Sequence, residues 1–584
     1  MQSSGEKNGS THEKINVGDE GLEFVAFGSS YNLGGGGPPL IQREELPTNI
    51  LHRFRRNMKL CGVGAVAGMG MFSESYFLFA LGNIHEIWKR LYPACFDPAD
   101  ESCNDSIVES FTYVEVSGVI CGMLTFGIFA DILGRRWGSC STATIMFVGG
   151  VLTTAAYASN LDGMFIFFLV ALLVFAYGVG GEYPLASASA AERAEQAKKN
   201  PQLAAHHIRG KSVVFTFAMQ GWGNWVNTLV IMLILLATNC TGETCSSSSL
   251  ELTWRLQYGI GSFFLMILMI GRFVYLKESE VWKENQIKKK KLESEVAEAR
   301  AQPGFVEDEG SESNVRLLLR HYWHRIVGTA GGWFVWDVVF YGNKLFQGKI
   351  IATIIGGEPT VYEVLVYTLI NSTIALAGYY CAALTIDKTW MGRRRLQSIG
   401  MFFTFVLFLI CGLLYDTLAK PENIGYFQAL YYLSSFFGQF GPNSTTWLLP
   451  SELFPTQVRT AAHGFSAAAG KLGALTATFV FTYGGPGGTP LGSKEIFLVC
   501  SVCGLTGLFL TLTFIPDVTT LDLVHLDDRW ELIVDGRPDD YHGDAIHPVY
   551  LSWFETVTGI GCDCPTVDCQ QNNHSEPTAD LSTV

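Results

Sequence analysis

Twelve apolar runs, each of about 20 residues and so long enough to cross a bilayer as a helix, constrain this 584-residue chain more than any other feature. We place them at 60–81, 111–132, 138–158, 164–185, 213–237 and 254–275, then at 326–351, 362–386, 400–418, 426–449, 461–483 and 496–515. A charged stretch at 277–320 separates two sets of six. The sequence therefore predicts an all-α membrane protein of twelve transmembrane helices and excludes a soluble enzyme.

Basic residues of the short loops gather on one side of this twelve-span arrangement. They lie at 53–56, 135–136, 198–211, 288–291 and 393–395. Because Lys and Arg accumulate in cytoplasmic loops, we expect this side and both termini in the cytoplasm, in a multi-pass protein of the plasma membrane. In the loops on the opposite side, Cys95 is close in sequence to Cys103, and Cys240 to Cys245. Each pair could form a small disulfide or remain as two free thiols, and the sequence does not decide between these alternatives.

Polar segments divide the chain around the two helical sets. We expect a cytoplasmic N-terminal tail at 1–58, a six-helix bundle at 59–276, a cytoplasmic central loop at 277–324, a second bundle at 325–516 and an acidic cytoplasmic tail at 517–584. The tail supplies nearly all of the formal net charge of −14, so this charge says nothing about a substrate. Its cysteines Cys562, Cys564 and Cys569 could bind metal, carry palmitate or be silent, and we favour the silent interpretation.

An acid lies in the middle of the seventh apolar run. Trp333, Asp337 and Tyr341 recur at four-residue intervals there, so they share one face of a helix. A carboxylate facing lipid costs several kcal/mol. We therefore expect Asp337 to face the protein interior or a water-filled cavity, where it is a candidate for a functional site.

Two loops repeat one pattern, once in each set of spans. The segments 127–136 and 387–394 both resemble the G-x-x-x-D-x-x-G-R-R loop of the major facilitator superfamily. The resemblance implies a cytoplasmic gate, in which an acid and an arginine pair within the loop and with a neighbouring helix end. The expected gating residues are Asp131, Arg135, Arg136, Asp387 and Arg393. Simple anchoring by positive charge is the alternative.

Further segments at 180–185, 440–456 and 462–471 resemble the phosphate:proton symporter branch of that superfamily, and most closely the fungal and plant proton-coupled phosphate transporters. The resemblance runs from Gly62 to Phe514. It implies two pseudo-symmetric six-helix bundles with a binding site between them at the midplane, and uptake of inorganic phosphate with protons by alternating access.

The resemblance also implies a phosphate pocket. Its expected lining is Tyr183, Gln220, Trp333, Asp337, Tyr341 and Asn443, with Lys471 nearby. Dihydrogen phosphate needs hydrogen-bond donors for its oxygens and an acceptor for its hydroxyls, and Asp337 can be that acceptor. An anion bound beside Asp337 favours protonation of this carboxylate, which would couple the two substrates. The alternative is that these side chains only pack helices together.

The first span departs from the pattern of this branch. Glu74 stands at its first acid position and Phe77 where a second acid is expected, while Glu182 replaces an aspartate. We expect Glu74, Glu182 and Asp337 to carry protons. The motif at 180–184 also resembles permeases for glycerophosphodiesters. These or other organic phosphates, polyols or sugars are the alternative substrates, and a non-transporting nutrient sensor is a further one. We expect no cofactor, no metal site and no nucleic-acid partner.

Overall fold

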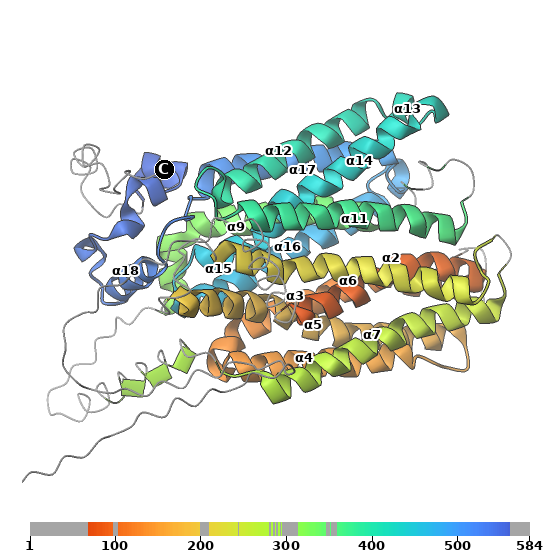
Figure 1. Ribbon diagram of the computed structural model, residues 1–584, viewed down its shortest axis with the longest axis horizontal. Coiled ribbons are helices and arrows are strands. Elements are labelled where there is room, and N and C mark those ends of the chain that lie inside the picture. The colour runs from red at the N-terminus through yellow and green to blue at the C-terminus, as the bar shows by residue number, and fades with distance from the viewer. Residues whose placement is uncertain are drawn as a thin grey trace, which may run out of the picture. The chain divides into compact units, whose positions relative to one another are not determined.

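Long helices make up the part of the chain that this computed structural model describes, namely residues 68–96, 103–198, 209–242, 245–278, 313–345 and 359–560 with isolated positions between them (Figure 1). The first set is α2 (Met69–Leu91), α3 (Asp105–Leu133), α4 (Arg135–Thr154), α5 (Leu161–Lys198), α6 (Arg209–Ala237) and α7 (Ser247–Tyr275). The second set is α9 (Asn314–Leu345), α11 (Val361–Thr385), α12 (Gly392–Leu413), α14 (Ile424–Gly438) with α15 (Ser444–Glu452), α16 (Thr456–Tyr483) and α17 (Ser493–Phe514). No β-strand occurs among the described residues.

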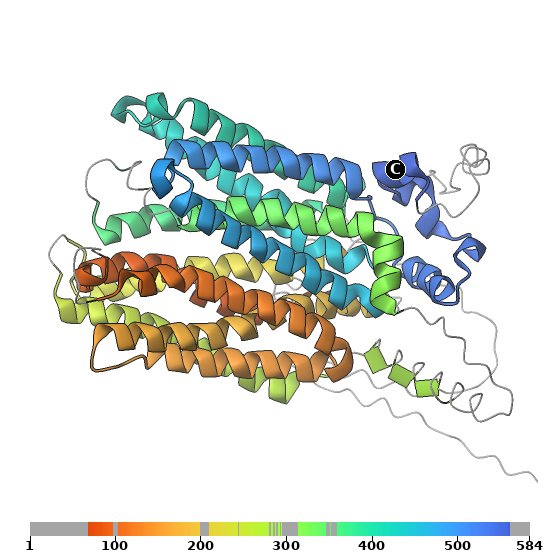
Figure 2. The ribbon, with the colours of Figure 1, turned by 180° about the vertical axis from the view of Figure 1, so that it is seen from behind.

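The two sets pack by the same rule. In each set the first helix packs on the fifth (α2 on α6, α9 on α16), the second on the fourth (α3 on α5, α11 on α14) and the third on the sixth (α4 on α7, α12 on α17). Between the sets, α3 packs on α16 and α11 packs on α6, so the second helix of each meets the fifth of the other. The predicted fold of two pseudo-symmetric six-helix bundles is thus confirmed, and both views show the bundles side by side (Figure 1, Figure 2).

Glycines let the two bundles approach closely where α3 meets α16. A Cβ atom on Gly464 would lie 2.7 Å from the carbonyl oxygen of Met123 and 3.1 Å from the Cα atom of Gly127. Contacts as short as the first are essentially absent between real Cβ atoms and backbone oxygens, so a larger residue at this position would push the bundles apart. Small residues at helix crossings are a common feature of membrane proteins, because van der Waals packing there replaces the hydrophobic effect.

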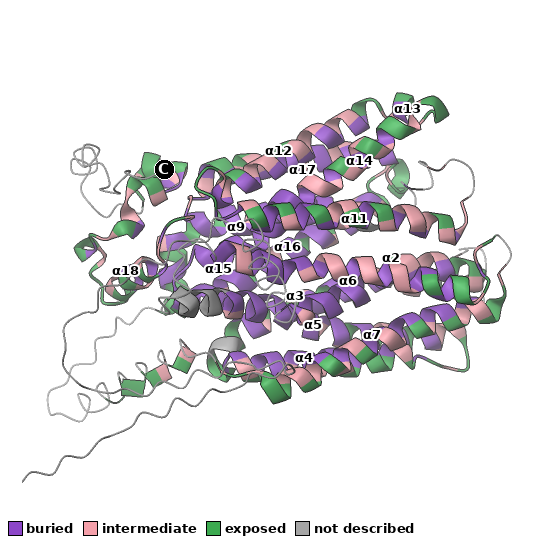
Figure 3. Cartoon of the chain, viewed as in Figure 1, coloured by how far each residue is buried: buried purple, intermediate pink, exposed green. Residues whose placement is uncertain are grey.

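Buried residues concentrate where the two bundles meet, along α3, α6, α15 and α16 (Figure 3). The outer faces carry exposed apolar side chains instead, such as Phe263, Ile270 and Val274 on α7 and Phe402 on α12. Exposed apolar side chains on long helices fit contact with lipid. The described helices α3, α5, α6, α7, α11, α12, α16 and α17 are long and apolar enough to span a membrane by length and composition.

The remaining four spans are less apolar for local reasons. α2 and α9 carry the buried acids Glu74 and Asp337, and α4 begins with two arginines. The tenth span is divided, because a π-helical segment, η3 (Gln439–Asn443), lies between α14 and α15 and contains Pro442. Each of the twelve predicted spans nevertheless falls mainly on these helices. Positions 155–158 lie beyond the end of α4, and positions 60–67 and 346–350 fall outside the described residues.

Several helices extend beyond the apolar runs at the end that carries the basic loops, which we call the basic end. The predicted span 400–418 is the clearest correction, because α12 begins at Gly392 and ends at Leu413, and the short helix α13 (Tyr415–Leu418) follows. The hydropathy pattern excluded the arginines at 393–395. Arg393 can nevertheless be buried in the helix end, because its Nε atom lies 2.8 Å from the carboxylate of Glu452.

Two disulfides lie at the opposite end. Cys95 is bonded to Cys103 and Cys240 to Cys245, which settles the alternative that the spacing left open. The predicted N-terminal tail, the central loop apart from some positions near its ends, and the cysteines at 562, 564 and 569 lie outside the described residues.

The segment after α17 packs across the basic end of both bundles. It contains α18 (Val524–Val534) and α19 (Trp553–Thr558). Arg209 of the first bundle donates to the carbonyl oxygens of Leu521 at 3.3 Å and Val518 at 3.4 Å. Trp530 is fully buried against Tyr322 and Phe454 of the second bundle. We call residues 515–560 the strap, because they touch both bundles.

A buried ion pair anchors the far end of the strap. Glu555 on α19 accepts from Arg325 of α9 at 2.8 Å and contacts His324 at 2.7 Å, and all three side chains are buried. Burial alone would raise the pKa of the Glu555 carboxyl, but the Arg325 guanidinium and hydrogen bonds from His324 and from the backbone of Ser552 hold this pKa well below its usual range.

We expect Glu555→Gln to lower the free energy of unfolding by about 3 kcal/mol, because it leaves the Arg325 charge buried without its partner. Hydrogen exchange of the backbone amides of the strap measures this loss together with thermal unfolding in detergent. The carboxylate contribution is present above the unfolded pKa of about 4.3 and is lost as the pH falls toward the depressed native pKa. The difference between wild type and variant should therefore shrink in acid.

Asp539→Asn is the matched control, since Asp539 lies in the same segment but is exposed. In this control variant, the backbone amides of the strap should exchange hydrogen at the wild-type rate. Equal exchange in the Glu555→Gln variant at neutral pH would show that this pair does not hold the strap in place.

Candidate functional site

Asp337 and Lys471 form an ion pair between α9 and α16, at the centre of the second bundle. The Lys471 Nζ atom lies 2.8 Å from the Asp337 Oδ2 atom, and both side chains are only 3% exposed. The same ammonium lies 5.1 Å from the ring centroid of Tyr183 and 4.5 Å from that of Tyr341. A carboxylate and two aromatic faces thus stabilise one buried positive charge.

A chain of hydrogen bonds starts beside this pair in the first bundle. Tyr183 of α5 donates from its hydroxyl to the Glu74 Oε1 atom of α2 at 2.6 Å. Gln220 of α6 donates from Nε2 to the Tyr183 hydroxyl at 3.2 Å. Glu74 is 1% exposed, and its second oxygen, Oε2, has no hydrogen-bond partner within the described part of the chain. A buried carboxylate oxygen without a donor is costly, so a proton on this oxygen or a new donor would stabilise the site.

The hydrogen-bond chain continues into the second bundle. The Gln220 Oε1 atom accepts from the Tyr379 hydroxyl at 3.0 Å and from the Asn443 amide at 3.2 Å. Asn443 also lies 2.5 Å from the Tyr379 hydroxyl, and its Oδ1 atom accepts from Trp336 Nε1 at 2.8 Å. A single amide on α6 therefore bonds side chains of both bundles.

The π-helical segment η3 places Asn443. One extra residue in its turn widens the helix, and such segments occur frequently at functional sites. The neighbouring backbones are close, because a Cβ atom on Gly441 would lie 2.5 Å from the Cα atom of Gly400 on α12. The widened turn therefore packs directly against α12.

All seven residues that the sequence predicted for the phosphate pocket belong to one connected cluster. Hydrogen bonds and the Lys471 ammonium join most of them, and the ring of Trp333 lies 6.3 Å from that of Tyr183. We call Glu74, Tyr183, Gln220, Trp333, Asp337, Tyr341, Tyr379, Asn443 and Lys471 the central cluster. It lies where α2, α5 and α6 of one bundle face α9, α11, η3 and α16 of the other.

Glu182, the third expected proton carrier, makes a separate pair. Both of its carboxylate oxygens accept from the guanidinium of Arg272 on α7, one of them at 2.7 Å from Nη1. The same guanidinium donates to the Ser139 carbonyl oxygen at 2.8 Å and to Thr142 at 3.2 Å. Protonation of Glu182 would therefore break a formed ion pair, whereas Glu74 has an oxygen without a donor.

The predicted gating residues of the second bundle form a buried cluster at the basic end. Asp387 accepts from Arg393 at 2.8 Å and caps the first turn of α6, accepting from the backbone of Gly210 at 3.1 Å. Glu452 accepts from Arg393 at 2.8 Å and from Arg209 of α6 at 2.7 Å. We call these bonds the basic-end clasp, because they join α6 of the first bundle to the loop after α11, to α12 and to α15 of the second.

The corresponding loop of the first bundle is built differently. The backbone N–H groups of Arg135 and Arg136 donate to the Glu278 carboxylate at 2.7 and 3.2 Å, so an acid after α7 caps α4. Gly134 has a φ of +87°, and a Cβ atom there would lie 2.5 Å from a Glu278 oxygen. Asp131 lies in α3, but its side chain falls outside the described residues. Its pairing stays a prediction.

The sequence interpretation missed several polar residues that the fold brings into contact with distant partners. Tyr379 belongs to the central cluster, and Glu278 and Arg272 make ion pairs or caps that only the fold brings together. Glu115 of α3 is an acid 8% exposed inside the second span. Like Asp337, Glu115 lies within an apolar run, and this position in the sequence is the signal that marks it as a buried acid.

Comparisons with known proteins agree with this architecture. The model of the sugar (and other) transporter family matches residues 63–530. Over 487 residues the chain is 28% identical to low affinity inorganic phosphate transporter 3 of Petunia hybrida, covering 76% of this chain and 88% of the relative. It is 26% identical to glycerophosphoinositol permease 1 of Candida albicans, covering 80% of each.

A solved structure shares the fold. The proton:xylose symporter XylE, a major facilitator superfamily protein, superposes with a TM-score of 0.63 at 19% identity and covers 82% of this chain and 99% of that one. Because the family model spans most of the sequence, the chain belongs to the sugar (and other) transporter family and has the major facilitator fold.

Proposed function

We propose that this protein is a proton-coupled symporter of inorganic phosphate that works by alternating access. The observation that carries the proposal is the central cluster, which combines the buried Lys471–Asp337 pair, the second acid Glu74 and neutral hydrogen-bond donors of both bundles. A relative named as an inorganic phosphate transporter, matching over most of both chains, supports the choice of substrate.

The donor set of the central cluster suits a dihydrogen phosphate ion. Lys471 offers a positive charge, while the amides of Gln220 and Asn443 and the hydroxyl of Tyr183 can each turn toward an oxygen of the anion. Asp337 can then accept from a phosphate hydroxyl. The seven residues that the sequence analysis named are retained as the proposed phosphate site, with Tyr379 added.

Proton coupling follows from competition for Lys471. An incoming phosphate that bonds this ammonium weakens the Lys471–Asp337 pair, and the Asp337 carboxylate then lies beside a second negative charge. Both changes favour protonation of Asp337, so the proton and the anion each ease the binding of the other. Glu74 is the second proposed carrier, joined to the cluster through Tyr183. We retain Glu182 as a third proposed proton carrier, although its ion pair with Arg272 has to break before it can take a proton.

Alternating access is supported by contacts between the bundles at both ends. At the basic end Arg209 bonds Glu452, and at the opposite end the Tyr483 hydroxyl of α16 donates to Glu109 of α3 at 3.1 Å. Opening of either end requires its own contacts to break while those of the other end hold. Asp131, Arg135, Arg136, Asp387 and Arg393 stay the proposed gating residues, with Glu452 and Arg209 added.

The proposed topology places the basic end in the cytoplasm, with both termini on that side of the plasma membrane. The positive loops support this orientation, and so do the disulfides at the opposite end, since oxidising compartments lie outside the cytoplasm. Residues 59–276 and 325–516 are then the two transport halves, joined by a cytoplasmic loop at 277–324.

Asp337→Asn should abolish uphill accumulation of phosphate, because an amide can hydrogen-bond the anion but cannot carry a proton. Radiolabelled phosphate uptake into proteoliposomes, with and without an inward proton gradient, measures the effect. In the wild type, accumulation should fall as the external pH rises.

Asp416→Asn is the control for this variant, because Asp416 is 76% exposed and pairs only with Lys494 on the surface in the described structure. It should accumulate phosphate normally. If the Asp337→Asn variant still concentrates phosphate when a proton gradient is imposed, Asp337 is not the coupling residue.

Arg209→Ala should slow uptake about tenfold while changing phosphate affinity less than about threefold, because it removes one bond of the clasp and two bonds to the strap, and so shifts the equilibrium between the open and closed basic end. Glu452 keeps Arg393 as its partner in this variant, so no acid is left buried alone. Equilibrium phosphate binding and initial uptake rates, measured on one preparation, separate the two effects. An equal loss of both would assign Arg209 to folding rather than to gating.

A further inference from the structure

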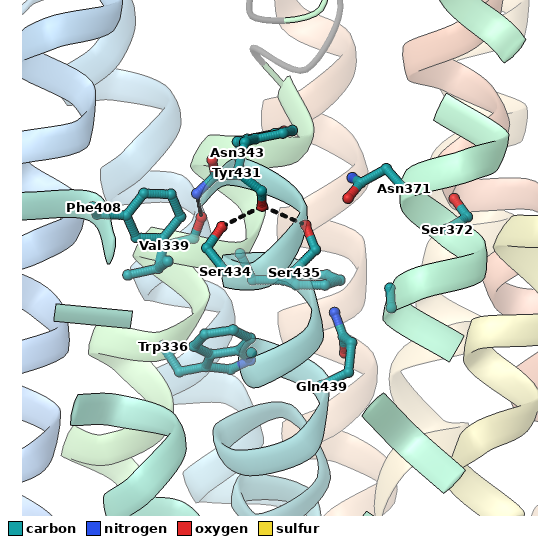
Figure 4. Close-up of a pocket in the computed structure, with 13 residues that line it drawn as sticks. Trp336, Val339, Asn343, Asn371, Ser372, Phe408, Tyr431, Ser434, Ser435 and Gln439 are labelled. Carbon is teal, nitrogen blue, oxygen red and sulfur yellow. Dashed lines mark hydrogen bonds between the residues drawn. The ribbon is translucent and has the colours of Figure 1, made fainter. Parts of the chain in front are cut away.

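A cavity of about 50 Å³ lies in the second bundle (Figure 4), and one of its lining residues, Trp336, bonds Asn443 of the central cluster. Helices α9, α11, α12, α14 and η3 surround it. Its polar lining is Asn343, Asn371, Ser372, Ser434, Ser435 and Gln439. None of the side chains that line it is charged, which distinguishes the cavity from the Asp337–Lys471 ion pair.

Three amide oxygens of this lining lack a partner. The Oδ1 atoms of Asn371 and Asn343 and the Oε1 atom of Gln439 are buried with no hydrogen bond to any described residue. Asn371 is 5% exposed and Gln439 is 7% exposed. A buried acceptor without a donor costs about 1–3 kcal/mol, so several in one cavity indicate a ligand that brings donors.

The chemistry of the lining selects hydroxyl groups. Unpaired amide oxygens repel an anion, and no carboxylate is present among the lining residues to neutralise a cation. A hydroxyl both donates and accepts, so it satisfies an amide oxygen and also bonds the serine hydroxyls. Ser434 and Ser435 already donate to the Tyr431 carbonyl oxygen, at 2.6 and 3.5 Å, which leaves their oxygens as acceptors.

The size of the cavity limits the ligand. A volume of about 50 Å³ holds roughly three to five water-sized groups. The arm of glycerol 3-phosphate beyond its ester oxygen has three carbons and two hydroxyls, about five such groups, at the upper end of this range. Trp336 and Phe408 add apolar faces for its carbon atoms (Figure 4).

Trp336 joins this cavity to the central cluster. Its ring lines the cavity, while its Nε1 atom donates to Asn443 at 2.8 Å. Gln439 and Asn443 lie at the two ends of the same π segment. The cavity also touches the first bundle, because Ser372 accepts from Asn224 of α6 at 2.9 Å. A ligand in the cavity would therefore contact the elements that move during transport.

We propose that this cavity binds the hydroxylated arm of a small phosphate ester whose phosphate group lies in the central cluster. The substrate class is glycerol monophosphate and esters of similar arm length, carried in addition to inorganic phosphate. The inference rests on the proposed phosphate site, since the ester needs that site for its charged group. The match to a glycerophosphoinositol permease is consistent with such a substrate.

Two matched esters test this subsite on the unmodified protein. Glycerol 3-phosphate and propyl phosphate have the same carbon chain, but only the first has hydroxyls on it. Each is added to proteoliposomes during radiolabelled phosphate uptake. Glycerol 3-phosphate should inhibit at a concentration about tenfold or more below that of propyl phosphate, because a site built to bond hydroxyls discriminates against an analogue without them. Equal potency, or inhibition by free glycerol as strong as that by glycerol 3-phosphate, would overturn the proposal.

Variants of the residues that line the cavity test whether the protein distinguishes the two esters at this cavity. Asn371→Leu and Gln439→Met each keep the side-chain size and remove the amide, and either should bring the potency ratio of the two esters toward one. Thr373→Val is the control, because Thr373 lies on α11 beside Ser372 but is exposed and bonds Trp225 instead. It should keep the wild-type ratio. A ratio unchanged in whichever lining variants fold would overturn the assignment to this cavity.

Direct uptake of radiolabelled glycerol 3-phosphate separates this inference from the proposed function. Uptake of glycerol 3-phosphate without any uptake of phosphate would refute inorganic phosphate as a substrate and support the subsite. Phosphate uptake that both esters inhibit equally would support inorganic phosphate as a substrate and refute the subsite.

Discussion

An ammonium and a carboxylate held 2.8 Å apart between α9 and α16 impose the main constraint on this fold. Either charge alone would be costly at this depth in a membrane, so Lys471 and Asp337 have to stay together until another charged or hydrogen-bonding group takes the place of one partner. The Lys471 ammonium faces the aromatic rings of Tyr183 and Tyr341, and the Tyr183 hydroxyl accepts from the Gln220 amide. In the proposed mechanism, phosphate takes the place of the Asp337 carboxylate beside the Lys471 ammonium.

The connections between the bundles fit this requirement. Gln220 of the first bundle bonds Tyr379 and Asn443 of the second, so a ligand that displaces these bonds acts directly on the contact between the halves. Farther out, the clasp around Glu452 and the strap at 515–560 join the basic ends of both bundles. In the proposed alternating-access mechanism, a change at the centre reaches these end contacts because each packed bundle moves as a body.

Much of the site could be predicted from local patterns and from the resemblance. Trp333, Asp337 and Tyr341 lie within one apolar run, and their spacing on a helix already placed them on one face. Glu278 and Arg272 could not be predicted in this way. Each contacts a partner that is far away in the chain. Glu278 accepts from the N–H groups at the start of α4, and Arg272 donates to Glu182. No periodic pattern in the sequence predicts such a pairing. The unpaired amides of Asn371 and Gln439 also became visible only in the structure, because satisfaction of a buried group depends on its neighbours in space.

The sequence alone determined the twelve helices, their division into two sets of six and the acid inside the seventh, because hydropathy and helical periodicity are properties of neighbouring residues. The tertiary structure decided which polar residues meet. In the fold, Lys471 pairs with Asp337, and Glu182 pairs with Arg272 instead of joining the central cluster. Helix α12 begins at Gly392, eight residues before the apolar run. The physical reason is that a charge inside a membrane protein is tolerated only beside its partner, and that partner is chosen by how whole helices pack.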